Sequence, residues 1–102
     1  MSKRSKACEI SQKTKEIVWN RDSYKCIICD KYVPKTCANA HYIKRSQGGL
    51  GIEQNIVTLC IQCHYEEDFG KNTKSYEEII EKYLIAKYGA EWDKSKLIYK
   101  KY

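Results

Sequence analysis

The chain has 102 residues and a formal net charge of +6, with 19 lysine and arginine side chains against 13 aspartate and glutamate side chains. This length fits one small domain, near the size at which a hydrophobic core alone gives only marginal stability. No stretch approaches the roughly 20 apolar residues needed to cross a membrane, so we expect no membrane partner. The basic start lacks the apolar stretch of a secretory signal, which favours a cytoplasmic protein.

The positive charge lies in the first two thirds of the chain. Residues 1–25 carry a net charge of +4, residues 26–63 carry +2, and residues 64–102 are neutral overall. A basic surface of this kind commonly binds a polyanion, and nucleic acid is the first candidate. Many solvated surfaces are also rich in lysine, so the charge alone is a weak signal.

The predicted elements, in chain order, give an α+β fold. A helix is expected over about 11–21, capped by Ser11. Strands are expected over 38–43 and 55–59, on either side of a glycine-rich loop. A helix should follow from residue 63 to 69 and end at Gly70, and a last helix should cover about 75–89. The last helix has a capping-box pattern at its start, Ser75-Tyr76-Glu77-Glu78, and Gly89 as its expected end.

Two pairs of cysteines dominate the sequence. Pairs with two intervening residues, separated by 30 residues, can close a tetrahedral four-cysteine zinc site. A disulfide scaffold is the alternative, and the absence of a secretory signal speaks against it. A structural zinc ion would also add folding free energy to a small domain. The pairs are Cys26-Ile-Ile-Cys29 and Cys60-Ile-Gln-Cys63, and we interpret Cys8 and Cys37 as ordinary free thiols.

Around these pairs the segment from residue 26 to 68 resembles the HNH endonucleases. The resemblance covers about 40% of the chain and rests on both cysteine pairs, a double glycine and three polar residues. It implies a zinc-stabilised ββα-metal core over about 24–70, inside a single domain of residues 1–102. The stretches that carry it are Ala40-His41-Tyr-Ile-Lys-Arg-Ser-Gln-Gly48-Gly49 and Asn55-Ile-Val-Thr-Leu-Cys60-Ile-Gln-Cys63-His64.

The resemblance also assigns roles to single residues. His41 aligns with the general base that activates water, Asn55 with the residue that orients the base, and His64 with a ligand of a catalytic divalent metal. The usual second ligand is replaced by Ala40, so Asp68, four residues after His64, is the candidate for that role. Asp68 equally fits a solvated acidic run. The metal would be Mg²⁺ or Mn²⁺, with Ni²⁺ a further option, and Lys44 and Arg45 would contact DNA.

The sequence therefore predicts a metal-dependent DNA endonuclease or nickase that hydrolyses phosphodiester bonds. Small members of this family are often phage-encoded, so the expected location is the cytoplasm of a bacterial host. Phage packaging proteins or other DNA-processing proteins are possible partners. The alternative is a zinc-ribbon module that binds nucleic acid without cutting it, with Ala40 as the mark of lost catalysis. The sequence does not indicate an oligomeric state or a recognition sequence.

Overall fold

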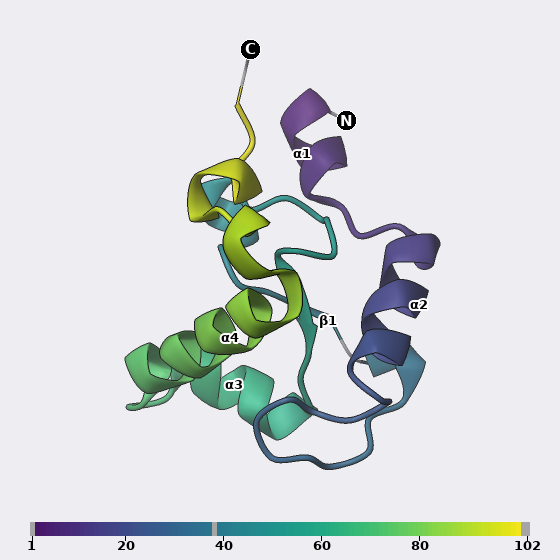
Figure 1. Ribbon diagram of the computed structural model, residues 1–102, viewed down its shortest axis with the longest axis vertical. Helices are drawn as coiled ribbons and strands as arrows, with labels where there is room; N and C mark the ends of the chain where they lie inside the picture. The colour runs from purple at the N-terminus through teal and green to yellow at the C-terminus, as the bar shows by residue number, and fades with distance from the viewer. Residues whose placement is uncertain (1, 38, 101–102) are drawn as a thin grey trace.

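The computed structural model describes residues 2–37 and 39–100, although the side chain of Cys37 lies outside this description. Its helices flank one small two-stranded sheet, so the α+β class predicted from the sequence is confirmed. Helices α3 and α4 lie together on one side of the sheet, and α2 lies on the other (Figure 1). The helices are α1 (Lys3–Cys8), α2 (Gln12–Arg21), α3 (Ile61–Phe69) and α4 (Thr73–Tyr88), and the strands are β1 (Asn39–His41) and β2 (Ile56–Thr58).

The two strands pair in antiparallel register, with Asn39 opposite Thr58, Ala40 opposite Val57 and His41 opposite Ile56. All three residues of β2 are buried. The strands are shorter than predicted, and Ala38, the first residue of the predicted strand, lies outside the described residues. The sheet is therefore a short central support, and the helices and loops around it carry most of the side chains considered below.

The buried Asn55 side chain holds the loop between the strands. Its Oδ1 accepts from the amide of Ile43, and its Nδ2 donates to the carbonyls of Ile43 and Leu50. The same loop runs close to itself at Gly49, where a Cβ atom would stand 1.7 Å from the carbonyl oxygen of Ile43. Only glycine fits at such a distance, so the loop conformation depends on that residue.

The helix ends agree with the sequence at three points and differ at two, and one difference is that α3 begins at Ile61 and not at residue 63. The Ser11 side chain caps α2 by accepting from the amide of Thr14, and α3 and α4 end at Gly70 and Gly89 as predicted. The capping box predicted at Ser75 is wrong. Helix α4 already begins at Thr73, whose hydroxyl donates to the carbonyl of Gly70, and this places Ser75 inside the first turn.

The two ends of the chain, which the sequence left unassigned, also take up structure. Helix α1 is capped by Ser2 and brings Cys8 into a buried position. Near the other end lies the short 3-10 helix η4 (Lys94–Leu97), whose Leu97 is buried and accepts from the amide of Leu50. Both segments cover the loop between the strands. Within the described residues, no helix combines the length and the apolar character that crossing a membrane requires.

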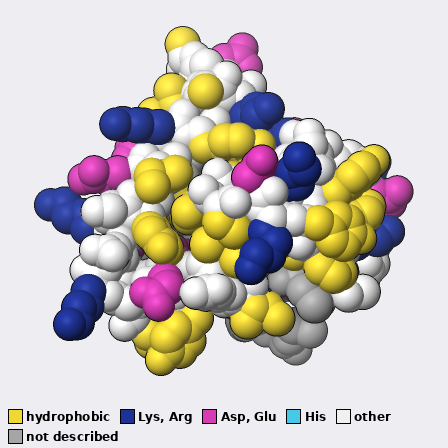
Figure 2. Space-filling model, turned by 90° about the horizontal axis from the view of Figure 1, so that it is seen from below, with side chains coloured by type: hydrophobic (Ala, Val, Ile, Leu, Met, Phe, Trp, Pro, Cys, Tyr) yellow, Lys and Arg dark blue, Asp and Glu magenta, His cyan; other side chains and the backbone are white. Residues whose placement is uncertain are grey.

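Hydrophobic side chains form one buried cluster between the sheet, α4 and the cysteine pairs. Residues of the first cysteine loop, both strands, α3 and α4 contribute to it. Other large hydrophobic side chains stay at the surface, and several groups of them appear on the lower face of the molecule (Figure 2). The buried members are Cys26, Val33, Ala40, Tyr42, Val57, Leu59, Cys60, Cys63, Ile80, Leu84 and Leu97.

Candidate metal centre

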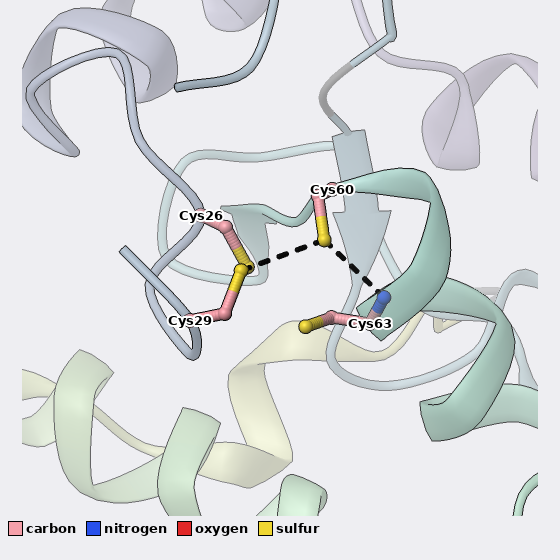
Figure 3. A group of neighbouring side chains, drawn as sticks. All are labelled: Cys26, Cys29, Cys60 and Cys63. Atoms are coloured by element: carbon pink, nitrogen blue, oxygen red, sulfur yellow. Dashed lines mark hydrogen bonds between the residues drawn. The ribbon is translucent and has the colours of Figure 1, made fainter. Parts of the chain in front are cut away.

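The four paired cysteines converge on one point, as predicted. Their sulfur atoms all lie within 4.8 Å of one another, and the sulfurs of Cys29 and Cys60 are 3.6 Å apart. One pair comes from the loop after α2 and the other from the first turn of α3 (Figure 3). Three of the four cysteines are buried and Cys29 is exposed. The cluster therefore joins two parts of the chain and reaches solvent at one edge.

The first pair lies in a tight loop that local hydrogen bonds close. The amide of Cys26 donates to the carbonyl of Lys31 over 2.8 Å, and the amide of Asp30 donates to the carbonyl of Cys26 over 2.9 Å. Asp30 takes a positive φ of 65°, a conformation that aspartate and asparagine tolerate better than most residues. The loop thereby directs both sulfurs to the same side.

The second pair opens helix α3. Cys60 occupies the capping position, and its sulfur accepts from the amide of Cys63 over 3.4 Å. The first turn of a helix carries unsatisfied N–H groups and a partial positive charge, which together favour a thiolate. Burial opposes ionisation of Cys60, but these hydrogen bonds and those from neighbouring thiols outweigh it, so that its pKa falls to about 7.

The remaining thiols of the cluster are harder to ionise. Burial, followed by the hydrogen bond to Cys60, raises the pKa of Cys63. Four thiolates this close repel one another, so the set cannot be fully ionised unless a cation lies between them. The four thiols can therefore ionise together only when they bind a metal ion.

The spacing of the sulfurs fits a single ion. With metal–sulfur bonds of about 2.3 Å, the sulfurs of a tetrahedral site stand about 3.8 Å apart. The 3.6 Å between Cys29 and Cys60 matches this edge, and the other sulfurs need only a small movement to reach it. Within the residues described here, this cluster is the one group of three or more ligand side chains that could hold a metal.

A buried carboxylate, not anticipated from the sequence, supports the cluster. Asp22 accepts from the guanidinium of Arg21, from the hydroxyl of Tyr83 and from the amide of Thr58. The carbonyl of Thr58 in turn accepts from the amide of Ile27, inside the first cysteine pair. The only signal of this role in the sequence was an acidic residue shortly before the first cysteine pair.

A second polar group lies farther along α3. Five of the residues predicted to act in catalysis or DNA contact, together with Asn39, line a hollow of about 170 Å³. Asn55 does not reach the hollow, because its amide holds the loop behind it. The residues predicted from the sequence that line the hollow are His41, Lys44, Arg45, His64 and Asp68.

The Lys44 ammonium in this hollow is already bound by two carboxylates. The Lys44 ammonium donates to Glu67 and, over 2.6 Å, to Asp68, and Asp68 lies 3.4 Å from the ring of His64. Glu67 is almost fully buried, and burial raises its pKa despite Lys44. The Nε2 of His41 donates to the carbonyl of Cys8 over 2.8 Å, and because a carbonyl only accepts, that nitrogen carries the proton. Burial lowers the pKa of His41, so the ring favours the neutral form.

Comparison with known proteins gives one informative match. No protein-family model matches the chain. A curated protein from Nostoc sp., anaredoxin, is 41% identical over 54 residues, which make up 52% of this chain and 68% of anaredoxin. The relative carries the name of a redoxin.

The expectation of an HNH endonuclease is therefore wrong, both as a family and as an enzyme activity, and so is the nucleic-acid-binding zinc ribbon offered as its alternative. The relative is named a redoxin and not a nuclease. The Lys44 ammonium also contacts the Asp68 carboxylate, which had been expected to bind a divalent metal. The predicted catalytic metal has no support among the described residues. The comparisons do not test the roles given to His41, Asn55 and His64, nor DNA as a partner, which stay predictions tied to the resemblance.

Proposed function

From the premise that this chain belongs to the same family as anaredoxin, we propose that it is an electron-transfer protein with one iron ion bound by Cys26, Cys29, Cys60 and Cys63. The observation that carries the proposal is the convergence of four cysteine sulfurs within 4.8 Å. Four thiolates around one iron allow it to exchange a single electron between its ferric and ferrous states. Zinc fits the same geometry but has no redox chemistry.

The sulfur spacing supports one ion over a multi-iron cluster. In two-iron and four-iron clusters, the cysteines ligate different irons that inorganic sulfide bridges. Their sulfurs then stand farther apart than the edge of a single tetrahedron. A set of sulfurs within 4.8 Å matches the smaller site, and this favours a centre without inorganic sulfide.

The chain supplies what a small redox centre needs. Backbone hydrogen bonds hold both the loop of the first cysteine pair and the first turn of α3, so the ligands keep their positions when the charge of the centre changes. The amide of Cys63 donates to the Cys60 sulfur, and such bonds stabilise the more negative, reduced state. Cys29 is exposed, which brings the centre close to the surface where an electron can enter or leave.

Metal content and redox behaviour test this function together. The protein should be purified without oxygen, from cells supplied with both iron and zinc. We expect about one iron per chain, no acid-labile sulfide, the strong visible absorption of ferric thiolate after oxidation with ferricyanide, and bleaching by one electron equivalent of dithionite. One zinc per chain with no visible absorption, even after reconstitution with iron, would instead support the structural zinc predicted from the sequence.

Variants of single cysteines sharpen the test. Cys60→Ser should lose the visible absorption, because one of its four ligands is gone. Cys8→Ser is the matched control, since Cys8 is a buried free thiol outside the cluster, and it should keep the absorption and one iron per chain. Equal spectra in the two variants would contradict the proposed ligand set.

A further inference from the structure

A row of large hydrophobic side chains lies uncovered on the outer face of α3. Ile61, Tyr65 and Phe69 are exposed to 74%, 61% and 75%. Residues four apart share one face of a helix, and the rings of Tyr65 and Phe69 are in contact, with centroids 5.4 Å apart. Single exposed hydrophobic residues are ordinary, but a continuous row marks a surface that binds something.

This row begins at the metal centre. Ile61 directly follows Cys60, and both line a hollow of about 540 Å³ whose wall is mostly apolar. Across the hollow stands Tyr32, which is 63% exposed and belongs to the loop of the first cysteine pair. Both α3 and this loop lie at the lower end of the molecule in Figure 1, on the face seen in Figure 2. A protein that covered this surface would touch the Cys60 residue itself.

The charges around the hollow indicate what kind of partner fits. Lys25, Lys31 and Lys35 lie in the adjoining segment, against the single acidic residue Asp30. Asp30 makes only a loose surface ion pair with Lys25, at 4.0 Å. The whole chain carries a charge of +6, so a second copy would meet like charges. An acidic partner is favoured in the encounter.

The acidic residues of α3 do not reverse this balance. Glu67 and Asp68 both bond the Lys44 ammonium, which offsets their charge. Glu66 is the remaining acidic residue of α3, and Lys71 follows shortly after the helix. The rim of the surface therefore stays basic, while its middle is apolar, as in the contact surfaces of proteins that bind and release their partners.

We propose that the surface formed by Tyr32, Ile61, Tyr65 and Phe69 docks an acidic one-electron redox protein, which exchanges its electron with the metal centre at Cys60. This inference rests on the proposed electron-transfer function. In the forward direction, one electron leaves the reduced centre of the partner and converts ferric to ferrous iron here. No covalent bond forms or breaks, and the step requires no further reactant.

Electron transfer from a defined acidic protein tests the surface. The probe is a reduced plant-type [2Fe–2S] ferredoxin, mixed with the iron-loaded protein by stopped flow, with the basic protein cytochrome c as the contrasting probe. We expect Ile61→Ser and Phe69→Ser each to lower the second-order rate constant about 10-fold. Ile85→Ser, at a residue 43% exposed on α4, is the control and should stay within about twofold. Salt should slow the reaction with ferredoxin.

The outcomes separate this inference from the function on which it rests. If Ile61→Ser and Phe69→Ser react as fast as the wild type, or if cytochrome c is the better partner at low salt, the docking proposal is overturned. Self-association of the wild type that Phe69→Ser abolishes would assign the surface to a second copy instead. If dithionite fails to reduce the iron, the proposed electron-transfer function is overturned, but the docking surface is not yet tested. Equilibrium binding of oxidised ferredoxin then decides the surface alone, and unchanged binding by Ile61→Ser overturns it.

Discussion

Helix α3 contributes residues to two clusters of potential metal ligands that differ in one respect. Near its start, Cys60 and Cys63 join the other cysteine pair (Figure 3), and the hydrogen bonds described for these sulfurs come from a thiol and a backbone amide rather than from a cationic side chain. Farther along the helix, the carboxylates of Glu67 and Asp68 already hold the ammonium of Lys44. Both clusters gather anionic groups, but only the second carries its own cation. A cluster of anionic ligands therefore needs a bound metal only where no cationic side chain of the protein balances its charge.

The largest expected effect comes from breaking the cysteine cluster. Cys63→Ser removes one ligand, and since metal binding contributes folding free energy directly, the loss should approach the whole stability of a small domain, about 5 to 15 kcal/mol. Urea unfolding followed by circular dichroism measures it. Chelation of the metal from the wild type should give the same loss. A chelated protein that unfolds at the wild-type urea concentration would show that the cluster is not structural.

The second effect comes from removing the internal cation. Lys44→Met leaves Glu67 buried without its partner, and we expect a loss of about 1 to 3 kcal/mol in the free energy of unfolding. The same variant should acquire weak binding of Mn²⁺ at Glu67, Asp68 and His64, which isothermal titration detects. The wild type should bind no Mn²⁺ there. Binding by the wild type with equal affinity would contradict the view that Lys44 occupies this cluster.

A smaller effect depends on pH. Burial raises the pKa of Glu67 above its ordinary value of 4.5, so the folded state holds this proton more tightly than the unfolded state does. The contribution of Glu67 to stability is therefore complete below pH 4.5 and is lost as the pH rises through the raised pKa. Glu67→Gln does not titrate, so its stability relative to the wild type should increase with pH over this window. A relative stability that decreases would contradict the direction of the shift.

The smallest expected effect on stability is at the exposed ion pair of Lys25 and Asp30, which serves as the reference for the buried pair of Lys44 and Glu67. Lys25 and Asp30 are 4.0 Å apart, and their side chains are 50% and 84% exposed. Exposed pairs at such distances contribute little, so Lys25→Met should change the free energy of unfolding by less than about 1 kcal/mol. Urea unfolding in parallel with Lys44→Met makes the comparison direct. A loss as large as that of Lys44→Met would mean that burial does not distinguish the two pairs.

The sequence predicted the cysteine cluster because two residues between paired cysteines define a local loop. It also predicted the ends of α3 and α4, because a helix-ending glycine such as Gly70 or Gly89 acts only on the turn next to it. It did not predict the bond from Lys44 to Glu67, or the role of Asp22, because these contacts join residues that only the folded chain brings together. Helix α1 was missed since six residues give too short a pattern to recognise.

The prediction of nuclease activity was wrong for a related physical reason. The resemblance to a nuclease depended on three polar residues at given spacings, and each has a structural partner in the fold. His41 bonds the carbonyl of Cys8, Asn55 ties the loop between the strands, and His64 lies beside Asp68. Spacing along the chain fixes where such residues lie, but their chemistry depends on what surrounds them, and that information comes from tertiary structure and from relatives.

The Asp22 carboxylate has a further consequence for how the molecule opens. It bonds the amide of Thr58 and the hydroxyl of Tyr83 on α4, while the carbonyl of Thr58 bonds the amide of Ile27 in the loop of the first cysteine pair. Strand, helix and metal loop are thereby tied into one cooperative unit. The amide protons of Ile27 and Thr58 should exchange with solvent at one common rate, and loss of the metal should accelerate both together.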